Sequence, residues 1–549
     1  MNKLFTRPVI LLVLFMTLAA QLLPVPALAA VAKTKNVIIL LADGCGATHT
    51  TVARWYKGSP LAMEEIVVGA VRTYSADSLI TDSAPAATAF ATGHKTSSKF
   101  IGILPAKAGM PNVGFSEVDK YRPIASVLEA AKLAGKSTGL IATANIQHAS
   151  PAAFSSHTYN RSDYNDIAQQ QVYLNMDIVF GGGKKYLLPK NEGGNRTDNE
   201  NLITVLKSRG YGLVENRKQL LAATDKKLWG IFAPDAMAYE FDREKLRPQE
   251  PSLAEMTDKA IKLLSKNNKG FFLFVEGSKV DWASHANDPS GVISDVLAFD
   301  DAVKTALDFA KKDGDTLVLA FSDHGNGGMS LGSKMTDKRY DTLPFEALVS
   351  PLRKVAVTGE GIEQILADDY SETNIRQVLE THFGISDLTT DEIAVIQKVK
   401  KGNMNAAIGP MLSKRSAIGW TTTGHTGEDL FLYGFGPNAP KGTVENTEIA
   451  QIIATALGVD LTKTTKRLFV EADAAFTAIG AEVEWDQSDK DNLRLVVTKG
   501  AIRAVMPVST NTITIGNETK QMEGLTIFAA KIGKVFIPQQ AVELVKSAR

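Results

Sequence analysis

Five short runs of apolar, mostly β-branched or aromatic residues recur along the chain, and longer amphipathic stretches separate them. The runs are Val37 to Leu41, Thr138 to Ala142, Phe271 to Val275, Thr316 to Phe321 and Leu430 to Tyr433. Unbroken apolar runs of this length are typical of strands that are buried on both faces of a parallel sheet. Helical periodicity predicts helices over Ile124 to Ala134, Leu253 to Leu264 and Val292 to Ala310. The alternation predicts an α/β fold, a three-layer sandwich with a mostly parallel central sheet.

Two parts of the chain break this alternation. Residues 331–420 separate two of the strand runs and are partly helical, as at 374–382 and 391–400. We interpret them as an insertion that covers the functional site. After about residue 466 the pattern changes to short alternating strands between turns, without a histidine. The sequence therefore predicts a catalytic domain over residues 36–466 and a small, non-catalytic α+β module over residues 467–549.

The first 29 residues have the pattern of an export signal. Lys3 and Arg7 give a positive start, an apolar run over residues 8–23 follows, and Ala27-Leu28-Ala29 offers small residues for cleavage. A membrane anchor is the alternative, but the run is short for a span and two prolines follow it directly. We therefore expect an exported protein, secreted or held at the cell envelope, with no stable membrane span after processing.

Composition removes some classes of function. The chain has 60 basic and 60 acidic residues, and the first 29 residues include two bases and no acid, so 58 bases would face 60 acids after cleavage. This balance offers no basic surface for nucleic acid. Cys45 is the only cysteine, so no intrachain disulfide can form, and we interpret it as a packing residue.

Charged residues flank the predicted strands at particular ends. Asp43 follows the first run, Glu276 the third and Asp323-His324 the fourth, while His425 precedes the fifth. Sites in open α/β sheets lie beyond the carboxyl ends of the strands. One acid after a strand is commonplace, whereas three acids with neighbouring histidines predict a metal-binding rim.

Asp281 and His285 add a pair at helical spacing. Residues four apart on one helix face the same way, so these two side chains can bind one cation. Carboxylate with imidazole is typical of zinc, and an oxygen-only set is typical of magnesium. For any one of these histidines, an ordinary surface or core position is the alternative.

Ser83 lies where a helix should begin. In Thr81-Asp82-Ser83-Ala84-Pro85, the proline suits a first helical turn and the alanines that follow favour helix. A helix N-terminus offers free N–H groups and positive potential to a bound phosphate. Alone, Ser83 would more often be a helix cap. Beside a metal-binding rim it becomes a candidate nucleophile.

Together these motifs resemble the alkaline phosphatases over about residues 36–470. The matching motifs are Asp43-Gly44, Thr81-Asp82-Ser83-Ala84, His148-Ala149-Ser150-Pro151-Ala152, Glu276-Gly277 with Asp281 and His285, Ser322-Asp323-His324 and Gly424-His425-Thr426-Gly427. The resemblance implies a metal-dependent enzyme that hydrolyses phosphate monoesters to alcohol and inorganic phosphate. It also implies a phosphoserine intermediate on Ser83.

The resemblance further implies a role for each site residue. Two zinc ions are expected, one held by Asp281, His285 and His425 and the other by Asp43, Asp323 and His324. One magnesium ion is expected at Asp43, Ser150 and Glu276. Arg161 resembles the family's phosphate-binding arginine, whose planar fork suits two phosphate oxygens.

Two positions depart from the best-known bacterial members. Those members carry an aspartate in place of His148 and a lysine in place of Trp282. His148 is expected beside the third metal site, where a neutral nitrogen favours zinc over magnesium. Trp282 is expected near the phosphate and brings no positive charge, so product phosphate should leave more easily.

The C-terminal module resembles the N-terminal-like domain of copper amine oxidases, without implying copper. An attachment to the cell envelope is one expectation for it, and a homodimer is left open. Within the superfamily, a phosphodiesterase or a sulfatase is the alternative function, although Ser83 and Arg161 favour monoesters. A non-catalytic phosphate- or metal-binding surface protein is the alternative of another class, and the full ligand set argues against it.

Overall fold

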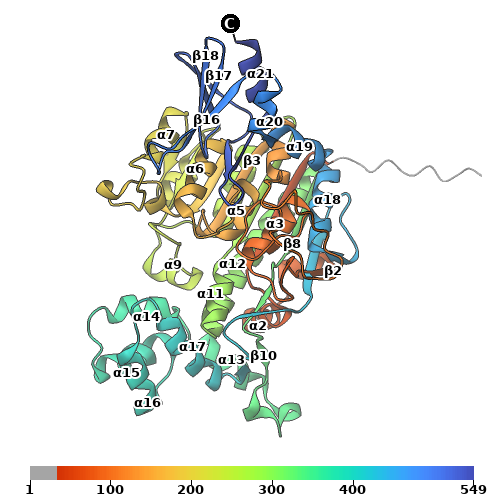
Figure 1. Cartoon of the computed structure of the whole chain (residues 1–549). Coiled ribbons are helices and arrows are strands. Elements are labelled where there is room, and N and C mark those ends of the chain that lie inside the picture. Colours follow the sequence, from red (N-terminus) through yellow and green to blue (C-terminus); the bar gives the residue numbers. More distant parts are fainter. Residues whose placement is uncertain (1–33, 549) are drawn as a thin grey trace, which may run out of the picture.

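A ten-stranded sheet forms the centre of the large domain in the computed structural model, which describes residues 34–548 (Figure 1). Across the sheet the strands are β14 (Gly442–Glu445), β2 (Val67–Arg72), β13 (Leu430–Phe435), β8 (Thr316–Phe321), β1 (Asn36–Ala42), β7 (Phe271–Gly277), β3 (Ser137–Asn145), β4 (Ile178–Gly182), β6 (Leu228–Ile231) and β5 (Gly212–Val214). Neighbours pair in parallel except at β13, which is antiparallel to both β2 and β8. The expected export signal, residues 1–29, lies outside the described residues.

Helices cover both faces of this sheet, because the strands are apolar on both faces. Ile38 and Leu40 of β1 point to one face, and Val37, Ile39 and Leu41 point to the other, all without exposed area. The first face is covered by α2 (Ala47–Lys57), α10 (Leu253–Leu264) and α12 (Pro289–Asp313). The second is covered by α3 (Ser83–Thr92), α4 (Val127–Leu133) and α18 (Asn446–Leu457). The predicted three-layer α/β fold is confirmed.

The stretch at 331–420 forms a mostly helical lobe at the lower left of Figure 1. Its helices are α13 (Phe345–Arg353), α14 (Gly359–Leu366), α15 (Glu372–Phe383), α16 (Thr390–Lys398) and α17 (Met404–Arg415). The lobe packs against α12 through α17. The buried Lys279 ammonium also donates to the Glu360 carboxylate in α14, at 3.1 Å. No helix within residues 34–548 has both the length and the apolar character needed to cross a membrane.

The C-terminal module, drawn in blue at the top of Figure 1, contains two small sheets and two helices. One sheet is an antiparallel meander of β16 (Glu482–Asp486), β17 (Arg494–Lys499), β18 (Ile502–Pro507), β19 (Thr512–Ile515) and β20 (Glu518–Gln521). The other joins β15 (Val470–Glu471), β22 (Lys534–Ile537) and β21 (Ile527–Ala529), beside α20 (Ala472–Thr477) and α21 (Gln539–Ser547). An apolar cluster that includes Phe476, Leu495 and Ile513 lies between these elements. The α+β class predicted for the module is confirmed.

Candidate active site

The sheet gathers the expected acids and histidines at one edge. Asp43 directly follows β1, Glu276 is the second-to-last residue of β7, and Asp323-His324 follow β8. His425 lies in β12 (His425–Thr426), a short strand just before β13 that pairs with β9 (Gly325–Asn326). Because β13 runs antiparallel to its neighbours, its beginning lies at the same edge as the carboxyl ends of the parallel strands. This reversal brings His425 to the acids.

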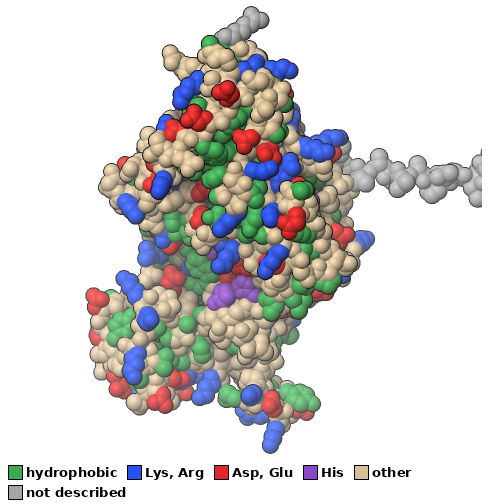
Figure 2. Space-filling model, in the orientation of Figure 1, with side chains coloured by type: hydrophobic (Ala, Val, Ile, Leu, Met, Phe, Trp, Pro, Cys, Tyr) green, Lys and Arg blue, Asp and Glu red, His purple; other side chains and the backbone are tan. Residues whose placement is uncertain are grey.

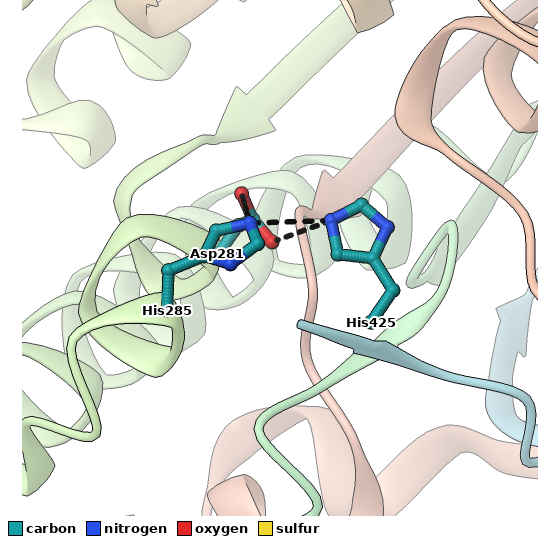
Figure 3. A group of neighbouring side chains, drawn as sticks. All are labelled: Asp281, His285 and His425. Atoms are coloured by element: carbon teal, nitrogen blue, oxygen red, sulfur yellow. Dashed lines mark hydrogen bonds and ion pairs between the residues drawn. The ribbon is translucent and has the colours of Figure 1, made fainter. Parts of the chain in front are cut away.

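Asp281, His285 and His425 form the first cluster, and their side chains point toward one another (Figure 3). Asp281 and His285 lie one turn apart on α11 (Lys279–His285). The Asp281 carboxylate lies 3.4 Å from His285 Nε2 and 3.6 Å from His425 Nε2. Histidine side chains reach the surface at the junction of the helical lobe and the large domain (Figure 2), so this part of the site is open to solvent.

The two imidazoles of this cluster present their lone pairs to each other. The Nδ1 atom of His285 lies 2.6 Å from the Thr423 carbonyl, and that of His425 lies 2.9 Å from the Thr81 carbonyl. A carbonyl only accepts, so Nδ1 carries the proton and Nε2 is left as an acceptor in each neutral ring. The two Nε2 atoms are 3.2 Å apart. Two facing lone pairs and a carboxylate fit a shared cation.

Asp43, Asp323 and His324 form the second cluster, which is fully buried. His324 Nε2 lies 3.4 Å from the Asp43 carboxylate and 3.3 Å from that of Asp323. Both oxygens of Asp43 and one of Asp323 have no hydrogen-bond partner among the described residues. Buried carboxylate oxygens without donors are costly unless a cation compensates them. The donor set of two oxygens and one nitrogen suits zinc.

A third group joins Asp43 to Glu276 and His148. Burial raises the pKa of Glu276 to about 8, although a hydrogen bond from Ser278 Oγ at 2.8 Å opposes the shift. Ser150 is buried in α5 (Ala149–Ser155), and its oxygen with the two carboxylates makes the oxygen-rich set that magnesium prefers. One Glu276 oxygen and the His148 Nδ1 atom have no partner within residues 34–548.

Mutual repulsion makes this group of acids unfavourable on its own. Burial raises the pKa of Asp43 well above its usual range, and the neighbouring carboxylates of Asp323, Asp281 and Glu276 raise it further. Four acids that share one pocket at neutral pH need positive charge in return. The residues at this edge therefore fit divalent cations by their chemistry as well as by their spacing.

Ser83 is the first residue of α3 and lies beside the second cluster. Its Oγ atom is 3.2 Å from His324 Nε2, and the residue is 2% exposed. Asp82 is the N-cap residue, in extended conformation and without a capping hydrogen bond from its side chain, and the helix behind Ser83 is buried along its whole length. The free N–H groups of the first turn therefore lie next to the Ser83 hydroxyl and the acids.

Arg161 reaches the same place from another part of the chain. Its guanidinium pairs with the Asp82 carboxylate through Nη1 and lies 3.1 Å from His148 Nε2 through Nη2. Burial alone would raise the pKa of Asp82, but Arg161 holds it below its usual range. The Trp282 ring meets the His148 ring edge-on, with 5.9 Å between centroids. The structure thus brings all twelve expected site residues, His148 and Trp282 included, to one edge of the sheet.

Sequence reasoning missed two supporting residues. Asp82 orients Arg161, and the signal for it was an acid directly before the candidate nucleophile. Asn326 donates to the Asp281 carboxylate at 2.6 Å through Nδ2, and only its position two residues after His324 pointed to it.

Comparison with known proteins places this site in a family. The family model described as alkaline phosphatase matches residues 34–459, most of the chain. The chain belongs to the alkaline phosphatase family. It is accordingly a phosphomonoesterase of that superfamily. A second family model, the copper amine oxidase N-terminal domain, matches residues 454–546, as the sequence predicted for the module.

Similar alkaline phosphatases come from several organisms. Alkaline phosphatase 3 of Bacillus subtilis is 38% identical over 448 residues, which cover 77% of this chain and 89% of the relative. The repressible alkaline phosphatase of Saccharomyces cerevisiae is 33% identical over 489 residues, with 79% and 83% covered. The Thermus thermophilus alkaline phosphatase structure has a TM-score of 0.69 at 26% identity, with 80% of this chain and 96% of that chain covered. A variant of the TAB5 alkaline phosphatase, in which one histidine is replaced with aspartate, has Mg bound in its M3 site (TM-score 0.55, 29% identity, 78% of this chain and 99% of that chain covered).

Proposed function

We propose that this alkaline phosphatase cleaves phosphate monoesters through a phosphoserine on Ser83, with two zinc ions and one magnesium ion at the three clusters. One observation supports this most strongly. Ser83 Oγ lies 3.2 Å from His324, beside buried carboxylates of which both Asp43 oxygens and one Asp323 oxygen have no hydrogen-bond partner within residues 34–548. A serine that only capped the helix would not require buried, unpartnered carboxylates beside it, so these surroundings favour the role of nucleophile.

The metal ions have assigned places in this proposal. Asp281, His285 and His425 would hold one zinc, and Asp43, Asp323 and His324 would hold the other. Asp43 and Glu276 would hold the magnesium together with Ser150, whose buried hydroxyl has no hydrogen-bond partner among the described residues. When bound, such ions act as Lewis acids that favour an ionised nucleophile and stabilise charge on a leaving oxygen. His148 contributes nitrogen beside the third site, so we expect magnesium to bind there weakly and zinc to compete. The magnesium in the histidine-to-aspartate variant of the TAB5 enzyme supports this view.

Ser83 acts as the nucleophile in the first half of the reaction. Its oxygen forms a bond to phosphorus as the bond to the alcohol oxygen breaks, which leaves a phosphoserine and free alcohol. The positive end of α3 favours the ionised hydroxyl and the negative phosphoryl group. Water then displaces Ser83 from phosphorus and releases inorganic phosphate.

Arg161 holds the phosphoryl group during both halves. Asp82 occupies Nη1, which fixes the plane of the guanidinium while other N–H groups remain for phosphate oxygens. His148 accepts from Nη2 and limits the rotation of the fork. A monoester offers more negative charge to this arginine than a diester does, so the geometry favours monoesters over the phosphodiesterase and sulfatase alternatives.

We also propose how the chain is organised and where it works. Residues 36–466 are the catalytic domain and residues 467–549 a separate module, because the module has an apolar cluster of its own. The export pattern at residues 1–29 supports secretion or attachment to the cell envelope, and the module is the candidate for envelope binding.

A direct assay tests the function. Purified protein is given p-nitrophenyl phosphate and bis-p-nitrophenyl phosphate in parallel, before and after chelation and after zinc and magnesium are restored. The proposal predicts that the monoester is preferred by several orders of magnitude and that only the metals restore turnover. The Ser162→Ala variant, which lacks an exposed serine hydroxyl next to Arg161, serves as control for Ser83→Ala. Equal turnover of the diester, or metal-independent turnover, would refute it.

A further inference from the structure

The segment 157–166 lies between the candidate site and the C-terminal module. At its centre, Arg161 turns its guanidinium to Asp82 and His148. The backbone of the segment pairs with the large domain through Thr158 and Ile101, and Arg161 N donates to the Lys99 carbonyl at 2.9 Å. On the other side the segment meets residues of the module. The orientation of Arg161 therefore depends on both parts of the chain.

A chain of hydrogen bonds leads from the module to this segment. Ser509 Oγ donates to one oxygen of the Asp166 carboxylate, and Gln170 Nε2 donates to the other at 2.9 Å. The Gln170 amide also binds the backbone of His157. Its oxygen accepts from the His157 N–H at 2.7 Å, and its Nε2 donates to the His157 carbonyl at 3.1 Å. Gln170 is 1% exposed, so water does not compete for these bonds. Four residues thus tie the module to the start of the segment.

Ser509 is held in an unusual backbone conformation where this chain begins. Its φ angle is +60°, in the left-handed region that residues other than glycine, asparagine and aspartate rarely adopt. Its N–H donates to the Thr526 carbonyl at 2.8 Å, and the residue is 3% exposed. Such strain persists only where the surroundings impose it, and here it aims the hydroxyl at Asp166.

The module meets the segment at few other points. Lys531 Nζ lies 4.6 Å from the centroid of the Tyr159 ring, and the Phe469 ring lies 4.7 Å from that of His157. Between these contacts a cavity of about 790 Å³ separates the two parts, lined by residues of both. The two parts also share an apolar cluster that joins Ala125 to Phe469 and Phe536, but this cluster lies outside the segment. At the segment itself, the module therefore acts through few contacts, and the Ser509 hydrogen bond is one of them.

We propose that the C-terminal module positions Arg161, and that Ser509 is the positioning residue that acts through Asp166, Gln170 and His157. The proposal rests on the function assigned above, in which Arg161 binds the phosphoryl group. The module then sets the affinity for phosphate without touching it. Loss of the Ser509 hydroxyl lets the segment shift, and the guanidinium fork no longer matches two phosphate oxygens.

The test uses the full chain with saturating zinc and magnesium and measures KM and kcat for p-nitrophenyl phosphate and the inhibition constant of inorganic phosphate. Ser509→Ala removes the hydroxyl, and Ser509→Gly removes it while it suits the positive φ, which protects folding. Ser509→Asn restores a donor and tolerates the left-handed conformation. Ser488→Ala is the matched control, since Ser488 Oγ donates to Asp486 at 2.6 Å entirely within the module.

We expect Ser509→Ala and Ser509→Gly to raise KM and the phosphate inhibition constant by about threefold to tenfold, with a smaller change in kcat. Ser509→Asn should recover most of the loss, and Ser488→Ala should match the parent protein. A fall in melting temperature with unchanged phosphate inhibition in both Ser509→Ala and Ser509→Gly would show a purely structural contact and overturn the proposal.

A double-mutant cycle separates this proposal from the function on which it rests. If Ser509 acts through Arg161, Ser509→Ala should have no further effect on phosphate inhibition in an Arg161→Ala background. Additive effects would overturn the positioning role while the function stands. An Arg161→Ala variant with the parent's inhibition constant would instead contradict the role of Arg161, and with it both proposals.

Discussion

Single side chains set how tightly this site should hold its product, and Trp282 offers a direct test. Its ring meets His148, which in turn contacts Arg161, so a side chain at this position lies close to the expected phosphate. Trp282→Lys adds a positive charge, and its Coulomb attraction to phosphate is worth about 1 kcal/mol or more, depending on exposure. We expect the inhibition constant of phosphate to fall by about fivefold.

The control for this variant is Trp55→Lys, which makes the same change on α2 at a tryptophan that is 43% exposed and meets the Phe345 ring edge-on. Both variants are compared at one pH and ionic strength. A constant in Trp282→Lys that equals or exceeds that of Trp55→Lys would show that residue 282 points away from bound phosphate.

At the same scale, sequence reasoning identified ligands better than it identified their partners. Asp281 and His285 were found because helical spacing puts both on one face of α11. The pair between Asp82 and Arg161 joins residues 79 positions apart, and no local pattern encodes such a contact. The metal roles of the ligands stay predictions, although the structure brings their atoms together.

The junction between strand β1 and helix α11 depends on a single glycine. Gly44 has a φ of +68°, and a Cβ atom there would lie 2.7 Å from the Asp281 carboxylate and 2.8 Å from its Cα atom. Gly44→Ala should therefore lower stability by about 1–2 kcal/mol through the left-handed backbone. It should lose about 1–3 kcal/mol more through overpacking. The displaced Asp281 should also weaken zinc binding.

Gly314→Ala is the matched control, because its φ is +75° and nothing lies within 4 Å of the added methyl group. Gly314→Ala should therefore lose stability only through the left-handed backbone conformation. Melting temperature and zinc content by elemental analysis are measured for both proteins. Equal zinc content in the two variants would contradict the account of this junction.

Among the elements, those with local signals were predicted and those without were not. Helix α10 has the predicted bounds because Ser252 and Glu255 form a capping box at its start. The helix predicted over Ile124 to Ala134 begins later, at Val127, after the cap at Ser126. The apolar run of β13 looks like that of a parallel strand, so its reversed direction could not be read from the sequence. In the module, β20 and β21 have only four and three residues, and β18 includes Arg503 and ends in Pro507, so the sequence did not predict these three strands.

The whole molecule should respond to pH through its buried acids when the metals are removed. The pKa of Glu276 is raised from 4.5 to about 8, so its contribution to stability is present below pH 4.5 and lost as the pH rises through 8. The Asp281 carboxylate, which accepts from the protonated His285 ring, raises the pKa of His285 from 6.5 to about 9, so the contribution of His285 to stability is present below pH 6.5 and lost as the pH rises through 9. Both effects have the same sign, and we expect chelated protein to melt several degrees lower at pH 9 than at pH 6.

Bound cations should remove most of this dependence, because they replace protons as the partners of the acids. Calorimetry at pH 6 and pH 9, with chelator or with zinc and magnesium, makes the comparison. If the chelated protein were as stable at pH 9 as at pH 6, the proposed destabilisation by ionisation of the buried acids would be contradicted.

At this largest scale the sequence predicted the two parts of the molecule and their classes, but not their contact. The hydrogen bond from Ser509 to Asp166 joins residues 343 positions apart, and its donor lies in a turn without a recognisable motif. Contacts between the module and the site depend on the folded arrangement of both parts, so the sequence pattern could not predict them.

The central claim is that Ser83 carries the phosphoryl group, and trapping the intermediate tests it most directly. The protein is mixed with substrate at a pH below its optimum, where the phosphoserine should accumulate, and quenched in acid. The peptides are then mapped by mass spectrometry. We predict one phosphorylated peptide that includes Ser83, and none from Ser83→Ala, whose turnover should fall by several orders of magnitude. Phosphorylation at another residue, or full turnover by Ser83→Ala, would contradict the account.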